Sequence, residues 1–118
     1  MNPFEIFKGM GQFASLMRNA PRIQEEIHQL QQRLGQLTAE GDAGAGMVKV
    51  KVNGRQEVLS CTLSEDALKL NDREMLEELI KAATNQALTR ARQLATDETA
   101  RMASSLGLPA GFKLPGAP

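Results

Sequence analysis

The 118-residue sequence is poor in aromatic residues, with four Phe and neither Trp nor Tyr. Leu, Ile, Val, Met and Ala must therefore supply the core. A chain of this length fits one small domain. With so few large side chains, it is expected to bury part of its apolar surface in an oligomer. The same lack of aromatic side chains leaves no platform on which exposed bases could stack.

Cysteine and histidine occur once each. The lone Cys61 excludes an intrachain disulfide and gives no indication of an oxidising compartment. Because Cys61 alternates with Leu59 and Leu63, we expect it to be a small buried apolar residue. The lone His28 lies among polar residues with no second ligand nearby, so we expect a solvated side chain and no metal site or cofactor.

Long apolar runs are also absent. No stretch approaches the length needed to span a membrane, and the start MNPFEIFKGM lacks the apolar run of a signal peptide. We therefore expect a cytoplasmic protein with no membrane partner.

Excess charge of either sign is missing, since 14 bases balance 14 acids, and net charge alone indicates no nucleic-acid partner. The balance is uneven along the chain, however. Residues 64–78 hold six acids and two bases, whereas residues 79–118 hold five bases and two acids. The sequence therefore predicts separate acidic and basic patches.

The most regular segment has apolar residues at alternating spacings of three and four, the pattern of a heptad seam. Its members are Phe13, Leu16, Ala20, Ile23, Ile27, Leu30, Leu34 and Leu37. The seam predicts a long helix over about residues 20–40, with the members from Ile23 onward forming a core or dimer seam. Pro21 interrupts the amide ladder, so either Asn19 caps a new helix there or the helix kinks. The motif NPFE at residues 2–5 predicts a short helix before it.

Three glycines in EGDAGAGMVKVKVNG, residues 40–54, follow this helix. Val48, Val50 and Val52 then alternate with polar or flexible residues, as in a half-buried strand. Asn53-Gly54 predicts a type I′ hairpin turn, and RQEVLSCTL, residues 55–63, the return strand. We interpret the glycines as the point where the chain leaves the helix and begins the hairpin.

A second long helix is predicted to begin with Asn71 as N-cap and Glu74 at N3, a capping-box pattern. SEDALKL before it predicts a turn or a single helical turn capped by Ser64. The helix is expected to end at residue 104 or 105. One face of this helix carries an apolar stripe formed by Leu76, Ile80, Ala83, Ala87, Ala91 and Leu94. The three alanines in this stripe would let another backbone approach closely.

The order helix, hairpin, helix predicts an α+β fold. We expect one domain over residues 1–106 and a Pro/Gly-rich C-terminal tail over residues 107–118. A two-stranded hairpin would leave apolar area on both long helices exposed in a monomer. We therefore predict a homodimer in which a second copy completes the small sheet.

No catalytic constellation can be assembled from the sequence. A Walker loop ends in Gly-Lys-Ser/Thr, but Met47 follows Gly46 here. A dinucleotide fingerprint needs a strand before its glycines and a helix after them, the reverse of this order. Glu77 and Glu78 are adjacent and point about 100° apart, as on an ordinary charged helix face. We therefore expect no enzymatic activity and no small-molecule substrate.

Basic residues are spread over three predicted elements. They are Arg18 and Arg22 on the first long helix, Lys49, Lys51 and Arg55 on the hairpin, and Arg90, Arg92 and Arg101 on the second. Arg90 and Arg92 lie about 200° apart on a helix, so there is no single basic stripe. On the residues alone, solubilising charge is at least as consistent with this pattern as a DNA-binding face.

The segments GDAGAGMVKVKVNG, EMLEELIKAATNQAL and LPAGFKLPG resemble the YbaB/EbfC family of bacterial nucleoid-associated proteins. The resemblance covers nearly the whole chain. It implies a small α+β homodimer shaped like tweezers that binds double-stranded DNA without catalysis and is associated with the nucleoid. On this hypothesis the arginines of the two helices contact phosphates, with Lys49, Lys51 and Arg55 as further candidates, and affinity depends strongly on salt.

An alternative hypothesis is a protein–protein adaptor without direct DNA binding. It would act on replication or recombination proteins through the acidic patch at residues 65–78 and the C-terminal tail. Partners that survive nuclease treatment and are lost on truncation after residue 105 would favour it.

Overall fold

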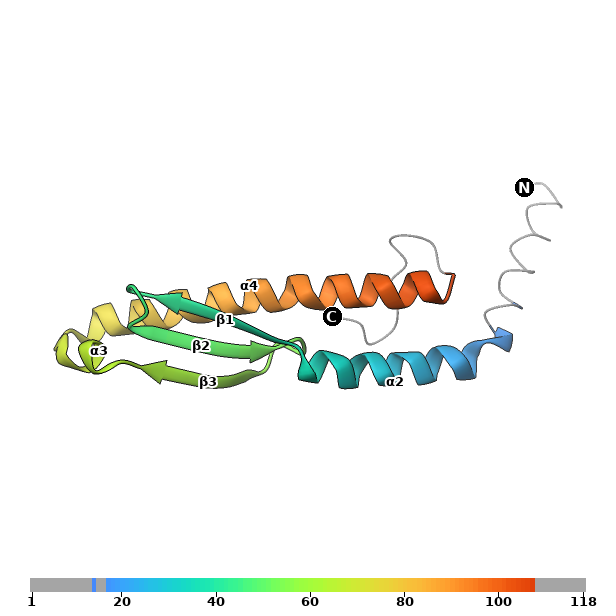
Figure 1. The fold of residues 1–118 in the computed structure, drawn as a ribbon, viewed down its shortest axis with the longest axis horizontal. Coiled ribbons are helices and arrows are strands. Elements are labelled where there is room, and N and C mark those ends of the chain that lie inside the picture. Colours follow the sequence, from blue (N-terminus) through green and yellow to red (C-terminus); the bar gives the residue numbers. More distant parts are fainter. Residues whose placement is uncertain (1–13, 15–16, 108–118) are drawn as a thin grey trace.

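The computed structural model describes residue 14 and residues 17–107 (Figure 1). Its elements are α2 (Ala20–Gln36), β1 (Thr38–Ala43), β2 (Val48–Asn53), β3 (Val58–Leu63), α3 (Glu65–Lys69) and α4 (Arg73–Ser105). The strands form one antiparallel sheet in the order β1-β2-β3. The α+β class is confirmed, with three strands where a hairpin was predicted. The helix predicted at residues 2–5 and the tail from residue 108 onward lie outside the described residues.

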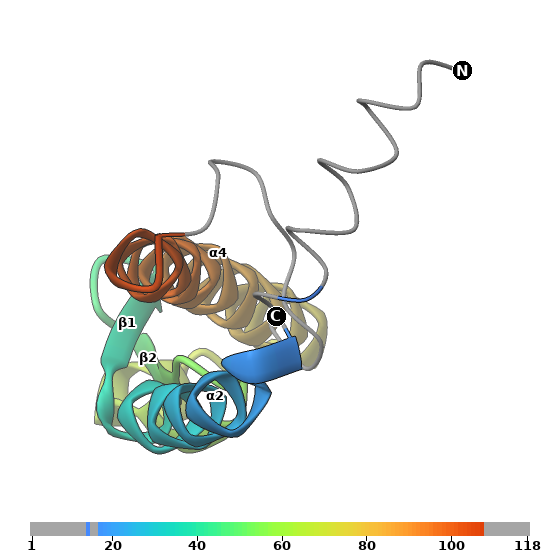
Figure 2. The ribbon, with the colours of Figure 1, turned by 90° about the vertical axis from the view of Figure 1, so that its right-hand side faces the viewer.

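Helix α4 lies alongside both the sheet and α2. Its 33 residues extend about 50 Å at 1.5 Å per residue. The first part crosses β1 and β2, and the later part lies beside α2 (Figures 1 and 2). We call residues 38–87 the sheet end, and residues 17–37 with 88–107 the helical end.

The core of the sheet end is built from valines and alanines. Val48, Val50 and Val52 are buried at every second position of β2, as their alternation predicts. They pack against Ala83 and Ala87 and, just inside the helical end, against Ala91. These alanines lie at intervals of four along α4 and confirm the predicted alanine stripe. Side chains this small allow the helix to lie close to the strands.

Gly41 of β1 marks the closest approach between helix and sheet. A Cβ added there would overlap the backbone oxygen of Ala83 and lie 2.6 Å from the backbone nitrogen of Ala87. Because backbone atoms cannot rotate away as a long side chain can, only glycine fits at this position.

The predicted first long helix was wrong over its last residues. The helix α2 ends at Gln36, Leu37 is extended, and the next six residues form β1. Ala39 and Gly41 are the buried positions of this strand, and both are too small to produce a readable apolar alternation. The glycines that follow form the β1–β2 turn, where Gly44, Ala45 and Gly46 have φ angles of 64°, 55° and 86°.

The predicted Asn53-Gly54 turn was also wrong. Asn53 is the last residue of β2, and its side-chain oxygen accepts hydrogen bonds from the backbone N–H groups of Arg55 and Glu57. Within the loop that follows, Gln56 has a positive φ of 64°. The N–H of Gly54 donates instead to the carbonyls of Leu34 and Leu37 at the end of α2, at 2.8 and 2.9 Å. The loop is therefore longer than two residues and is tied to α2.

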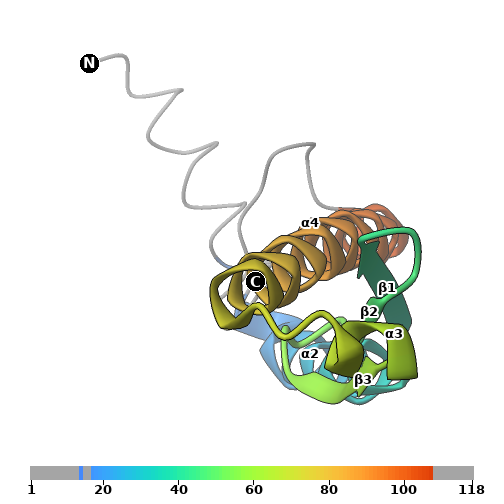
Figure 3. The same ribbon diagram turned by 90° about the vertical axis from the view of Figure 1, so that its left-hand side faces the viewer.

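Strand β3 differs from the prediction in burial. Cys61 is exposed, not buried, and Val58 and Leu59 are exposed by 55% and 50%. The physical reason is that α4 packs on β1 and β2 and β3 lies away from it (Figure 3). The register shift between Lys51 and Val52 pairs them with Ser60 and Val58, so Leu59 is the extra residue of a β-bulge.

The helix boundaries follow local capping. Ser64 caps α3 by accepting a hydrogen bond from Ala67 N–H, as predicted. The N-cap of α4 is Asp72, one residue after the predicted Asn71, and Asp72 accepts from Met75 N–H at 3.0 Å. A new helix, α2, begins beside Pro21, which lies in its first turn; the Asn19 side chain makes no capping hydrogen bond.

Candidate nucleic-acid interface

The helical end is held together by an apolar seam between α2 and the later part of α4. Leu30 and Leu34 are fully buried and cluster with Ala95 and Met102 of α4. The partly buried residues around them are Ile23, Ile27, Leu37 and Leu106. The heptad seam predicted as a core or dimer seam therefore packs within the chain, at least along this side of α2.

Three of the arginines proposed to contact DNA lie near the free ends of the two helices. Arg22 is exposed at the start of α2, Arg18 is exposed just before it, and Arg101 is exposed in the last turns of α4. Arg18 donates a long hydrogen bond, 3.5 Å, to the carbonyl of Ala14. Because α2 and α4 run antiparallel, the start of α2 and the end of α4 meet at the same extremity (Figure 1).

Arg90 has a structural contact with the outer edge of β1. Its Nη1 donates to the carbonyl of Glu40 at 2.7 Å. One turn earlier on α4, the Gln86 side-chain oxygen accepts from the N–H of Asp42 at 2.7 Å. Two outward-facing backbone groups of the β1 edge are thus satisfied by α4, which protects this edge against pairing with another strand.

Arg92 and Arg55 lie where the sheet and helical ends meet. Arg92 Nε is 3.4 Å from the side-chain oxygen of Gln56. Arg55 forms an ion pair with Glu57 at 3.3 Å, and a Cβ added at Gly35 would lie 2.6 Å from its Nη2. Both arginines remain exposed while helping to fix the loop after β2 against the helices.

Lys49 and Lys51 project from the face of β2 opposite its buried valines. Each stands across from an acid on β1, because the register pairs Asp42 with Lys49 and Glu40 with Lys51. The Lys51 and Glu40 side chains are 4.0 Å apart. The structure therefore separates these lysines from the arginines at the free ends of the helices and places each beside an opposite charge.

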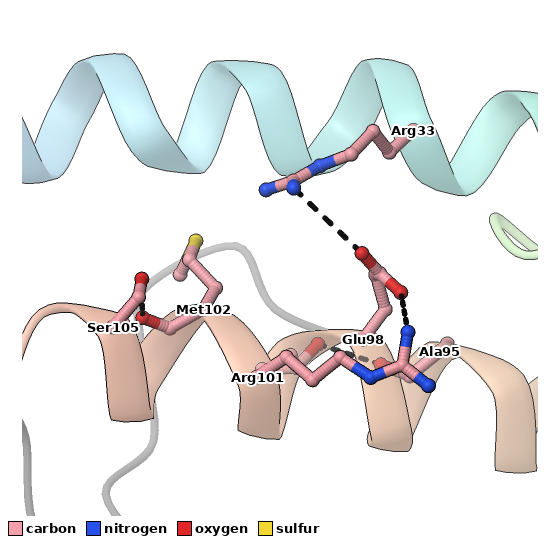
Figure 4. Close-up of polar contacts among 7 residues, drawn as sticks. Arg33, Ala95, Glu98, Arg101, Met102 and Ser105 are labelled. Atoms are coloured by element: carbon pink, nitrogen blue, oxygen red, sulfur yellow. Dashed lines mark hydrogen bonds and ion pairs between the residues drawn. The ribbon is translucent and has the colours of Figure 1, made fainter.

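The structure also brings together two residues that the sequence analysis did not single out. Arg33 of α2 and Glu98 of α4 form an ion pair across the two helices at 3.7 Å, and Glu98 also binds Arg101 (Figure 4). One signal was readable in advance, since Glu98 stands three residues after Ala95 and four before Met102. A charged residue at that spacing interrupts the apolar stripe.

Charge divides between the two ends. The helical end carries six bases and four acids, net +2, and the sheet end carries six bases and nine acids, net −3. The acid-rich residues 64–78 all lie at the sheet end. Of the bases that follow, Arg90 and Arg92 lie beside the sheet end and Arg101 lies near the free end of α4.

Within residue 14 and residues 17–107, no three His, Cys, Asp or Glu side chains are grouped as a metal site would require. In the same part of the chain, no helix combines the length and apolar character needed to cross a membrane.

A three-stranded sheet crossed by one long helix, which continues beside a second helix, defines a small α+β protein. The profile of the YbaB/EbfC DNA-binding family matches residues 10–106, and the chain belongs to this family. Its fold is similar to the crystal structure of the uncharacterized protein HP0035 from Helicobacter pylori. The TM-score is 0.66 at 21% identity, over 76% of this chain and 95% of that one.

Proposed function

We propose that the protein binds duplex DNA as a homodimer, without catalysis, through salt-dependent contacts between its helical ends and backbone phosphates. Membership of a DNA-binding family supports DNA as the ligand. The observation that selects the surface is the group of exposed arginines near the free ends of the two helices, Arg18, Arg22 and Arg101, away from the acidic sheet end. Phosphates attract the first and are repelled by the second. A nucleoid-associated role in the cytoplasm follows from such binding.

The contact set proposed first comprises the exposed arginines at the helical end: Arg18, Arg22, Arg90, Arg92 and Arg101. Among these, Arg18 and Arg22 have the most freedom to reach a phosphate, because Arg90 and Arg92 already contact Glu40 and Gln56 and Arg101 is paired with Glu98. Lys49, Lys51 and Arg55 are secondary candidates because acids lie beside them.

Dimerisation is proposed to use the sheet end. Most of the large exposed apolar side chains gather there: Val58, Leu59, Leu68, Leu70 and Met75, each 37–66% exposed. Strand β3 has an open edge beside them, whereas Gln86 and Arg90 satisfy backbone groups along the edge of β1. A second copy bound at β3 and α3 would bury this surface. The two helical ends would then project from the shared sheet like the arms of tweezers.

A binding titration over a salt series tests the DNA proposal. Labelled duplex DNA is titrated with protein between about 50 and 200 mM salt, and the logarithm of the association constant is plotted against that of the salt concentration. We expect a negative slope of about 0.9 per phosphate contact. No binding at about 50 mM salt, or a flat slope, would overturn the proposal.

The adaptor function is favoured by one feature, the acids around the exposed Leu68 and Met75 at the sheet end. A basic apolar protein segment would complement this surface. Pull-down in the presence of nuclease separates the two functions, since partners held through DNA are lost and partners of an adaptor persist. In the proposed dimer this surface is covered, so adaptor binding would also require the monomer.

A further inference from the structure

Glu98 places a carboxylate in the seam between α2 and α4. Its neighbours on this face of α4 are Ala95 and Met102, both buried in the seam. The Glu98 side chain is only 15% exposed. An apolar side chain at this position would pack there without losing the hydration of a charge. Packing alone therefore does not explain why a carboxylate occupies this position in the seam.

Two arginines from opposite helices share this carboxylate (Figure 4). One Glu98 oxygen, Oε2, accepts from Arg101 Nη1 at 3.2 Å. The other, Oε1, lies 3.7 Å from Arg33 Nη1. The side chains of Arg101 and Arg33 are 77% and 47% exposed, so both remain accessible from solvent. Ion pairs with partners this exposed contribute little to folding.

A guanidinium group binds carboxylate and phosphate through the same planar arrangement of donors. Glu98 lies between Arg33 and Arg101 and contacts one of them with each of its two oxygens. A phosphate oxygen arriving from solvent would meet the outward side of both groups. The arrangement thus has the geometry of an anion site bridging two helices, already occupied by an internal anion.

We propose that Arg33 and Arg101 form a binding site for a DNA backbone phosphate and that Glu98 competes with the phosphate for it. This inference rests on the proposed DNA-binding function. The competition lowers affinity for DNA of any sequence and keeps the complex easily reversible. Glu98 does not contact the phosphate itself. It occupies the two guanidinium groups in the free protein and is displaced from them when DNA binds.

The test compares Glu98→Gln with Asp97→Asn, which removes the same charge from the adjacent residue. Asp97 is exposed and accepts a hydrogen bond from Gln93 at 3.0 Å, on a different face of α4 from the two arginines' shared carboxylate. At about 100 mM salt we expect Glu98→Gln to bind duplex DNA roughly five- to tenfold more tightly than the wild type, about the effect of one further phosphate contact. Asp97→Asn should change affinity by about twofold at most.

A double-mutant cycle separates competition from a structural effect. In a background carrying Arg33→Ala and Arg101→Ala, the gain from Glu98→Gln should fall to that of Asp97→Asn. A gain that persists without the arginines would mean general repulsion and would overturn the inference. Thermal unfolding of every variant identifies any loss caused by misfolding.

The two proposals can fail separately. Wild-type protein that binds DNA while Glu98→Gln matches Asp97→Asn, or binds more weakly, overturns the phosphate site alone. If neither wild type nor Glu98→Gln binds duplex DNA at about 50 mM salt, the DNA-binding function fails, and the inference fails with it.

Discussion

The sheet end and the helical end are built on the same helix but pack it in different ways. At the sheet end α4 presents alanines to the strands, close enough that β1 needs Gly41. At the helical end it faces the leucines of α2 with Met102 and the charged Glu98. The sheet end leaves apolar side chains exposed beside acids, and the helical end has an excess of bases.

The difference indicates how one continuous helix can serve two surfaces. At the sheet end, small side chains let α4 lie close to β1 and β2, and β3 stays uncovered. At the helical end, larger side chains form a buried seam between α2 and α4, and the arginines on the outside of these helices remain exposed. According to the proposed function, the sheet end binds another copy of the protein and the helical end binds DNA.

The largest effect is expected from removing the close approach at the sheet end. Gly41→Val would drive a side chain into the α4 backbone at Ala83 and should lower the free energy of unfolding by about 3 kcal/mol. Chemical denaturation measures it. The neighbouring Glu40→Ala, on the exposed face of β1, should change stability by about 0.5 kcal/mol or less. Equal effects of the two would contradict the packing at Gly41.

The proposed dimer surface is tested by charge. Leu68→Glu introduces an unpaired acid into a surface already acidic, and should raise the dimer dissociation constant about 100-fold, or about 2.7 kcal/mol. Analytical ultracentrifugation measures it. Met17→Glu, an exposed apolar residue at the helical end, is the matched control and should leave the dimer intact. A dimer unaffected by Leu68→Glu would exclude this part of the surface.

The DNA surface is tested by comparing bases from the two ends. Arg22→Ala should weaken DNA binding roughly five- to tenfold at about 100 mM salt and make the salt slope shallower by about 0.9, the share of one phosphate. Lys49→Ala, which removes a base opposite Asp42, should have a much smaller effect. The salt titration described above measures both. If the lysine proved more important, the interface would belong to the sheet end.

The smallest effect is expected in the β1–β2 turn. Ala45 has a φ of 55°, a conformation that costs an alanine about 1 kcal/mol. Ala45→Gly should stabilise the fold by about 0.5 kcal/mol after the greater freedom of glycine in the unfolded chain is counted. DNA affinity should not change. Thermal unfolding and the DNA titration together show whether the sheet end can be stabilised without altering the helical end.

The local patterns predicted elements with their own periodicity or caps. The heptad residues of α2, the alternating valines of β2, the Ser64 cap and the alanine stripe of α4 all occur as expected. The predictions failed where a distant segment decides the structure. Residues 38–43 became a strand because β2 and α4 pair with and cover them, and Asn53-Gly54 was drawn into contact with α2.

The candidate interface shows the same limit. Sequence alone located the arginines and their excess toward the end of the chain, but Arg33 and Glu98 are 65 positions apart and meet only through packing. By itself, the sequence determined the family, the α+β class and the main helices, because these depend on short-range periodicity and motifs. The tertiary structure decided which strand stays uncovered and which charges are already paired. Those properties depend on the path of α4, whose long-range contacts no local pattern encodes.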